Sequence, residues 1–184
     1  MAAEKHRILL GIGSNLQRNH HIALALDELA REFGELDISR VFESEPVGIT
    51  GAENFYNLVV GFYSDIDVAA LSQWTKQLEA ATGRRPEDGR AAPKHLDIDL
   101  LCVGNLHGVV DGITLPRDEI LTSAFVLRPL AESFGSEVHP VLALNYAVLW
   151  GRFRQAQRLW PVEFQWRGTT ISRTDAQPTE KPLS

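Results

Sequence analysis

Apolar residues in the first hundred positions recur with two different spacings. Four stretches have the length and composition of strands: residues 7–13, 36–42, 54–63 and 93–104, the last with its apolar run at 100–103. Between the first two stretches, and again between the last two, apolar residues recur every three or four positions, which predicts a helix of about four turns in each gap. The resulting order, βαββαβ, indicates an α+β protein on the ferredoxin-like plan, with an antiparallel sheet and both helices on one face.

Polar residues mark the ends of both predicted helices. Asn19 is the expected N-cap of the first helix, and Gly34 is its expected C-terminal stop. At the start of the second helix, Asp65 and Asp67 are expected to supply an N-cap and a dipole-favoured acid, and Gly83 lies near its end. These helix-end roles explain the two aspartates without a metal.

The second half of the chain follows a less regular pattern. Its expected elements are a small hairpin at 106–115, a helix at 121–134 and a further helix at 141–150. Asp111-Gly112 has the composition of the hairpin turn, whereas Pro129 fits the first of these helices only near its start. The polar composition after Trp166 predicts a single domain over residues 1–166 and a disordered tail over 167–184. The tryptophan-rich segment 139–166 either caps the sheet or mediates association.

Composition narrows the class of protein. The 184 residues suffice for one domain with a sizeable core, and 44% hydrophobic with 23% charged residues is ordinary for a globular protein. A formal net charge of -6 argues against a nucleic-acid partner. The single cysteine, Cys102, excludes a disulfide framework and suggests a reducing compartment. Since no signal peptide or run of transmembrane length is visible, we expect a cytoplasmic protein without a membrane partner.

Two carboxylates open the fourth predicted strand. Asp97 and Asp99 are two positions apart, so they point to one side, about 6–7 Å apart, while Ile98 points to the other side. A loop rich in glycine, proline and cationic residues, 83–94, precedes them. Carboxylates that can bind Mg²⁺ beside a basic loop are the parts that phosphoryl transfer from a nucleotide requires. The alternative is that the two acids are only a solvated strand end.

A second candidate site lies at the start of the third predicted strand. Phe55 and Asn57 share one face there, and an aromatic ring beside an amide suits a flat heteroaromatic ligand with hydrogen-bonding edges. Core packing and a strand-end turn are the alternatives. Gly11-Ile-Gly13, at the end of the first strand, lacks the third glycine of a dinucleotide-binding motif and favours a tight turn with close backbone approach.

Several short motifs together resemble those of the 6-hydroxymethyl-7,8-dihydropterin pyrophosphokinase family. In chain order they are Gly11-Ile-Gly-Ser-Asn-Leu16, Ser44-Glu-Pro-Val-Gly48, Asn54-Phe-Tyr-Asn57, Gly83-Arg84, Leu96-Asp-Ile-Asp-Leu-Leu101, Leu115-Pro116 and Ala124-Phe-Val-Leu-Arg-Pro-Leu130. Each motif alone is weakly specific, but their shared order and spacing over about residues 7–135 are specific. The ferredoxin-like plan read from the hydrophobic pattern agrees with the fold of that family.

The resemblance implies a folate-pathway enzyme that transfers the two terminal phosphates of ATP to the hydroxymethyl oxygen of the pterin and leaves AMP. It implies two Mg²⁺ ions held by Asp97 and Asp99, and catalysis assisted by Arg84 and Lys94. The implied pterin-binding residues are Ser44, Glu45, Val47, Phe55, Asn57 and Phe125. The implied nucleotide-binding residues are Lys76, Glu79, Arg84, Arg90, Lys94, Ile98, Thr114 and Arg117.

The chain departs from the family pattern among the residues expected to bind phosphate. Lys94 stands where the family carries an arginine, which keeps the charge but loses the bidentate fork. Pro86 and Ser123 replace arginines, Ala91 replaces a loop tryptophan, and Arg117 replaces a histidine. Three hypotheses follow: an active pyrophosphokinase with a variant nucleotide site, a catalytically weakened paralogue that binds pterin or nucleotide in a regulatory role, and a ferredoxin-like nucleic-acid or amino-acid binding module. The acidic charge and the aspartate pair argue against the last.

Overall fold

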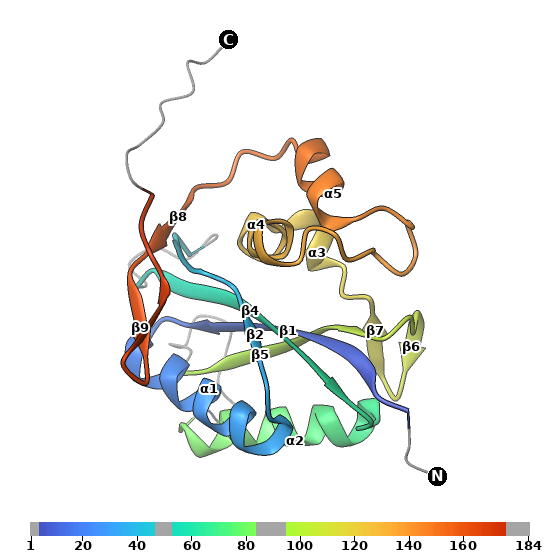
Figure 1. The fold of residues 1–184 in the computed structure, drawn as a ribbon, viewed down its shortest axis with the longest axis horizontal. Coiled ribbons are helices and arrows are strands. Elements are labelled where there is room, and N and C mark those ends of the chain that lie inside the picture. Colours follow the sequence, from blue (N-terminus) through green and yellow to red (C-terminus); the bar gives the residue numbers. More distant parts are fainter. Residues whose placement is uncertain (1–3, 47–52, 84–94, 176–184) are drawn as a thin grey trace.

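A six-stranded antiparallel sheet lies between two layers of helices in a computed structural model, which describes residues 4–46, 53–83 and 95–175 (Figure 1). The strands of this sheet are β1 (His6–Ser14), β2 (Asp37–Ile38), β3 (Val41–Ser44), β4 (Phe55–Ser64), β5 (Asp97–Val103) and β8 (Leu159–Val162). The order β5-β1-β4-β3 is that of a ferredoxin-like sheet, and β8 extends it beside β3. The predicted α+β fold class is therefore confirmed.

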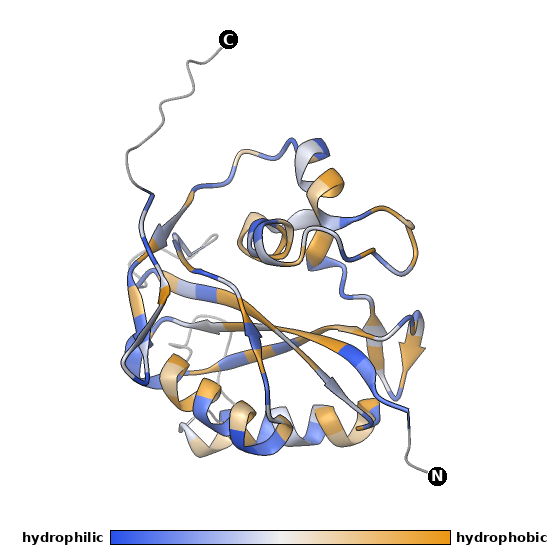
Figure 2. Ribbon diagram, in the orientation of Figure 1, coloured by the Kyte–Doolittle hydropathy of each residue, from blue (hydrophilic) through white to orange (hydrophobic). Residues whose placement is uncertain are grey.

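Helices α1 (Arg18–Phe33) and α2 (Val68–Ala81) cover one face of the sheet, as predicted (Figure 1). Apolar and polar residues alternate along α1, whereas the strands carry longer apolar stretches (Figure 2). The main core between these layers packs Ile8 and Leu10 of β1 against Ile22 and Leu26 of α1 and Leu71 of α2. Since the sheet is apolar on this face, the two helices bury their apolar stripes against it.

A second helical layer covers the opposite face of the sheet. It consists of α3 (Glu119–Thr122), α4 (Ala124–Ser133) and α5 (Tyr146–Arg152). Its core joins Leu127 and Leu130 of α4 to Leu9 of β1. A β-bulge in β5 adds Leu101 between the residues that pair with Leu10 and Leu9, so Leu101 and Cys102 both pack in this second core.

The helix ends confirm some of the predicted signals and correct others. Helix α1 begins at Arg18 after Gln17, which has a left-handed backbone (φ 44°), so Asn19 lies inside the helix and is not its N-cap. Gly34 ends α1 as predicted. The Asp67 carboxylate accepts a hydrogen bond from the Ala70 amide at 2.8 Å, which confirms the N-cap of α2. Asp65, by contrast, lies outside the first turn of that helix.

The second predicted strand is split into β2 and β3. The Val59 amide donates a hydrogen bond to the Ser39 hydroxyl at 2.8 Å, where a regular ladder would offer a backbone carbonyl. The pairing with β4 consequently shifts by one residue between Ile38 and Phe42. A side-chain oxygen that replaces a backbone oxygen is not visible in hydrophobic spacing, which is why the sequence predicts one strand.

The elements after β5 differ from prediction mainly in their bounds. Strands β6 (Gly108–Val110) and β7 (Ile113–Leu115) form the predicted hairpin, with Asp111 and Gly112 both at positive φ, as a two-residue turn requires. The helix expected over 121–134 is two helices separated at Ser123, and Pro129 lies inside α4 instead of near its start. The last helix, α5, runs over Tyr146–Arg152 instead of 141–150.

The segment predicted as a disordered tail begins with a hairpin. Strands β9 (Phe164–Trp166) and β10 (Thr169–Ser172) pair, so the ordered structure continues past the predicted boundary at residue 166. Ser172 is buried, and its hydroxyl accepts a hydrogen bond from the Val41 amide at 2.9 Å. The hairpin escaped prediction because it is held by distant contacts: Phe164 is buried in the main core, and the Trp166 indole donates a hydrogen bond to Asp27 of α1 at 2.9 Å. Residues 176–184 lie outside the described part of the chain.

Candidate active site

A cavity of about 230 Å³ opens on the face of the sheet that α4 covers. Its floor is formed by the central strands β1, β4 and β5, and its walls by the end of β3 and the chain around α3 and α4. The residues that line it are Gly11, Ile12, Gly13, Ser44, Glu45, Pro46, Phe55, Asn57, Leu58, Val59, Asp97, Asp99, Leu101, Arg117, Glu119, Phe125 and Val126. The cavity therefore brings the predicted carboxylates and the predicted ring-binding residues into one site.

The strand register explains how these two groups meet. Gly13 of β1 pairs with Asn57 of β4 on one side and with Asp97 of β5 on the other. Directly paired residues of an antiparallel sheet point to the same face, about 5 Å apart between Cα atoms. The amide and the carboxylate thus flank a glycine at a Cα separation of about 10 Å. Two residues earlier in β1, Gly11 pairs in the same way with Asp99.

Gly13 is required at this position by a close contact. A Cβ atom built on it would lie 2.9 Å from Asn57 Oδ1, closer than side chains tolerate. A Cβ atom on Gly11 would meet Leu101 only at 3.5 Å, which is ordinary contact. The two glycines lie within β1, so the predicted tight turn is wrong, whereas the predicted close approach is confirmed at Gly13.

Aromatic and amide groups form one end of the cavity. Asn57 is buried, and its amide nitrogen donates a hydrogen bond to the buried Ser44 hydroxyl at 2.9 Å. This bond fixes the amide orientation of Asn57 and leaves Oδ1 on the Gly13 side. Phe55 and Phe125 line the same end from β4 and α4. The result is an apolar slot with a polar edge, a shape that fits a flat heteroaromatic ring.

Charged groups form the other end. Arg117 contacts both Glu119, at 2.8 Å, and Asp99, at 3.4 Å. Burial raises the pKa of Asp99 to about 7, and the nearby negative charge of Asp97 adds to this effect. The positive charge of Arg117 lowers the pKa of Asp99, but it only partly offsets the effects of burial and of Asp97. Burial and this like charge therefore favour the neutral form of the Asp99 carboxyl.

Mg²⁺ fits this carboxylate pair. Among residues 4–46, 53–83 and 95–175, no three His, Cys, Asp or Glu side chains are grouped as a protein-only metal site would require. Mg²⁺ is commonly held by one or two carboxylates, with the remaining ligands supplied by water and substrate phosphates. The buried Nε–H of Arg117 has no hydrogen-bond partner within the described part of the chain, so it is available to donate to a phosphate oxygen.

Other residues predicted for nucleotide binding lie away from the cavity. The Ile98 side chain is buried in the core beneath α1 and α2, and Thr114 is exposed on β7. Lys76 is exposed on α2, where it lines a shallow groove with Asp111. Glu79 is buried, and its charge contributes to the raised pKa of Asp99. The predictions for Val47, Arg84, Pro86, Arg90, Ala91 and Lys94 lie outside the described residues.

The reasoning from sequence missed several cavity residues, among them Gly13 and Glu119. Gly13 was interpreted as a turn, although its position two after Gly11 on a predicted strand could have shown that both glycines face one side. Glu119 follows Arg117 by two positions, and only the structure shows that the two side chains pair beside Asp99.

The fold and the cavity define a class: a ferredoxin-like α+β protein with a ring-sized slot beside paired carboxylates. The family model described as 7,8-dihydro-6-hydroxymethylpterin-pyrophosphokinase matches residues 9–134. This chain belongs to that family. The residues matched include every strand and helix that lines the cavity.

Similar proteins agree with the family assignment. A 2-amino-4-hydroxy-6-hydroxymethyldihydropteridine pyrophosphokinase of Porphyromonas gingivalis is 30% identical over 134 residues, which cover 68% of this chain and 88% of that protein. A folate synthesis bifunctional protein of Arabidopsis thaliana is 28% identical over 134 residues, or 71% of this chain and 27% of that protein. The chain thus spans about a quarter of the length of this bifunctional relative.

The wild-type HPPK-DHPS structure of Plasmodium falciparum has the same fold. It superposes with a TM-score of 0.65 at 10% identity, covering 92% of this chain and 50% of that one. Within residues 4–46, 53–83 and 95–175, no helix has the length and apolar character needed to cross a membrane.

Proposed function

We propose that this protein transfers the terminal diphosphate of ATP to the hydroxymethyl group of 6-hydroxymethyl-7,8-dihydropterin in a Mg²⁺-dependent reaction of folate biosynthesis. The observation that carries the proposal is the row Asn57–Gly13–Asp97 across three strands. It joins a ring slot to a carboxylate pair with only a glycine between them. The family match does not favour the alternative of a weakened, regulatory paralogue.

The ring slot would orient the acceptor substrate. A pterin is flat, with hydrogen-bonding groups along its edge, so it can lie between Phe55 and Phe125 while Asn57 Oδ1 accepts a hydrogen bond from that edge. Ser44 holds the Asn57 amide, and Glu45 lies at the rim of the slot. A hydroxymethyl group on a ring bound this way can extend over Gly13 toward Asp97. A glycine floor is what leaves the space for it.

The charged end would bind the triphosphate. Asp97 and Asp99 would hold two Mg²⁺ ions, which would supply positive charge to neutralise the phosphates. Arg117 would contribute a phosphate contact, because its Nε has no partner within the described part of the chain. In the transfer, the hydroxymethyl oxygen forms a bond to the β-phosphorus, the bond between that phosphorus and the oxygen of AMP breaks, and the hydroxyl proton is released.

The remaining nucleotide contacts stay predictions. Arg84, Arg90 and Lys94 precede the carboxylate strand in the chain, where cationic groups would meet the phosphates. We propose small-molecule partners only, a pterin and ATP. The cytoplasmic location and the absence of a nucleic-acid partner remain predictions from sequence.

The test is product formation from defined components. The protein is incubated with ATP, Mg²⁺ and 6-hydroxymethyl-7,8-dihydropterin, and AMP is measured by chromatography while the pterin product is identified by mass spectrometry. We expect AMP and a pterin diphosphate in equal amounts, only when all components are present. ADP in place of AMP, or AMP formed without the pterin, would contradict the proposal.

A further inference from the structure

The chain breaks its helical path next to the ring slot. Helices α3 and α4 are separated at Ser123, which has an extended backbone (φ -121°, ψ 116°) and forms no side-chain hydrogen bond to cap α4. The first amides of a helix have no partner within the helix. The start of α4 matters to the site, because Phe125 is its second residue.

The side chain of Gln157 bridges this break. Its Oε1 accepts a hydrogen bond from the Ala124 amide at 2.7 Å, and its Nε2 donates one to the Thr122 carbonyl at 2.8 Å. The two backbone groups lie on either side of Ser123. A single planar amide therefore fixes the end of α3 relative to the beginning of α4. It takes the place of the missing cap on α4.

The backbone around Gln157 is itself fixed against the opposite wall of the slot. Leu159 begins β8 and pairs with Ser44 of β3, and the Trp160 indole donates a hydrogen bond to Glu43 at 2.8 Å. Ser44 also holds Asn57. The segment from Gln157 to Trp160 thus connects the α4 wall of the slot to the β3 wall. It lies beyond residue 134, where the family match ends.

Phe125 lies between two cavities. A second cavity of about 400 Å³ adjoins the first, and Phe125 lines both. Gln157 and Ala124 line this second cavity as well. The phenyl ring packs against the core beneath α4 on one side, and the two cavities leave its other sides less constrained than close packing would. The hydrogen bond from the Ala124 amide to Gln157 lies one residue from Phe125 in the chain.

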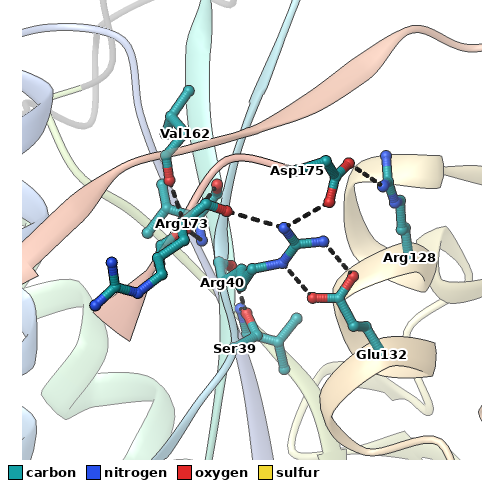
Figure 3. Close-up of polar contacts among 10 residues, drawn as sticks. Ser39, Arg40, Arg128, Glu132, Val162, Arg173 and Asp175 are labelled. Atoms are coloured by element: carbon teal, nitrogen blue, oxygen red, sulfur yellow. Dashed lines mark hydrogen bonds and ion pairs between the residues drawn. The ribbon is translucent and has the colours of Figure 1, made fainter. Parts of the chain in front are cut away.

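A different set of contacts holds the other end of α4. Arg40 binds Glu132 through two hydrogen bonds, one of them 2.7 Å long, and binds Asp175 at 3.0 Å (Figure 3). Asp175 also contacts Arg128 at 3.6 Å. Glu132 lies about two turns along the helix from Phe125, and Arg128 lies about one turn from it. These contacts anchor α4 to β3 and to the end of the described chain, away from the slot.

We infer that Gln157 is a positioning residue that holds Phe125 in the wall of the ring slot. The inference that this tunes pterin binding rests on the proposed function. Gln157 does not itself line the first cavity, so its effect is indirect. Gln157 lies outside residues 9–134, which the family model matches. It acts at the break between α3 and α4, where the Ser123 side chain does not cap α4.

The test compares Gln157→Ala with Gln157→Glu and with a matched control, Gln165→Ala, whose side chain is exposed on β9. Pterin and ATP affinities are measured by calorimetry, and amide hydrogen exchange over residues 122–127 by mass spectrometry. We expect Gln157→Ala to weaken pterin binding about tenfold and leave ATP binding unchanged. Exchange at 124–126 should rise. Gln157→Glu keeps the acceptor for the Ala124 amide, so it should show a smaller loss, and Gln165→Ala none.

The outcomes separate this inference from the proposed function. Unchanged exchange at 124–126 in Gln157→Ala, or equal losses of pterin and ATP affinity, would overturn the positioning role. Faster exchange with unchanged pterin affinity would also overturn it. Wild-type protein that binds no pterin would refute the proposed function instead, and the exchange data would still decide whether Gln157 holds the start of α4.

Discussion

The two ends of the cavity differ in how complete they are. At the ring end, Asn57 is hydrogen-bonded to Ser44, and Gly13 leaves just enough room for its Oδ1. At the carboxylate end, Asp97 and Asp99 repel each other, and Arg117 is shared between Asp99 and Glu119. The ring end is pre-organised for shape, whereas the repulsion at the other end is only partly offset by Arg117. A bound cation or a proton on Asp99 would relieve the rest.

This difference indicates that the two ends of the cavity have different roles. A rigid slot can select a flat ring by shape and hydrogen bonding without large rearrangement. Catalysis of phosphoryl transfer instead depends on charge brought in with the nucleotide and its metal. We therefore expect changes at the carboxylate end to affect turnover most, and changes at the ring end to affect pterin affinity most.

The largest effect is expected from removing one carboxylate. Asp97→Asn or Asp99→Asn should lower turnover about a thousandfold or more, because each removes a metal ligand while leaving the shape of β5. AMP formation measures the loss, and circular dichroism checks that the variants fold. Unchanged turnover in either variant would remove the two-metal assignment.

A smaller, selective loss is expected at the ring end. Phe125→Ala should weaken pterin binding by about 10- to 100-fold, because a stacking face of the slot is lost. ATP affinity should change little. Calorimetry with each ligand separately provides the comparison. Equal losses for the two ligands would indicate that Phe125 acts in the core and not in the slot.

The floor of the cavity offers a matched pair of substitutions. Gly13→Ala should weaken pterin binding about tenfold, because its Cβ would lie 2.9 Å from Asn57 Oδ1 and displace that amide. Gly11→Ala should have a smaller effect on the ring, since its Cβ meets Leu101 at 3.5 Å. Measuring the pterin affinity of both variants tests whether the ring lies over Gly13. A larger loss from Gly11→Ala would contradict the placement of the ring.

The smallest effect is on stability and its dependence on pH. The pKa of Asp99 is raised from 3.8 to about 7, so between those values the folded protein binds the proton more tightly than the unfolded chain. Without divalent cations, the free energy of unfolding should therefore fall as pH rises from about 4 to about 7. Thermal unfolding should show a shift of a few degrees.

Asp99→Asn and Mg²⁺ provide the controls for this prediction. At pH 8, Asp99→Asn should unfold at a higher temperature than the wild type when both are free of divalent cations. Addition of Mg²⁺ should raise the unfolding temperature of the wild type and not that of the variant. A wild type that is destabilised by acid between pH 7 and pH 5, relative to Asp99→Asn, would reverse the sign and contradict the burial argument.

Local periodicity was enough to predict much of the fold and part of the site. Asp97 and Asp99 share a face because strands alternate, and the same rule placed Phe55 beside Asn57. The βαββαβ order of the core followed from spacing alone. These features depend on residues close together in sequence, so a single chain reveals them.

Features that depend on distant contacts escaped prediction. The role of Gly13 requires the register of three strands, and Glu119 becomes part of the site only through Arg117 and Asp99. Ser39 splits a strand through one side-chain hydrogen bond. The C-terminal hairpin is polar in sequence and is stabilised against β3, more than a hundred residues away, by Ser172. The spacing of residues along the sequence does not reveal these long-range contacts.

The most direct measurement is a crystal structure with 6-hydroxymethyl-7,8-dihydropterin, a non-hydrolysable ATP analogue and Mn²⁺, which anomalous scattering locates. We expect the ring to lie between Phe55 and Phe125, with its hydroxymethyl group over Gly13. We expect manganese to be bound to Asp97 and Asp99. A ring bound elsewhere, or manganese bound away from the two aspartates, would contradict the claim that the row Asn57–Gly13–Asp97 brings the substrates together.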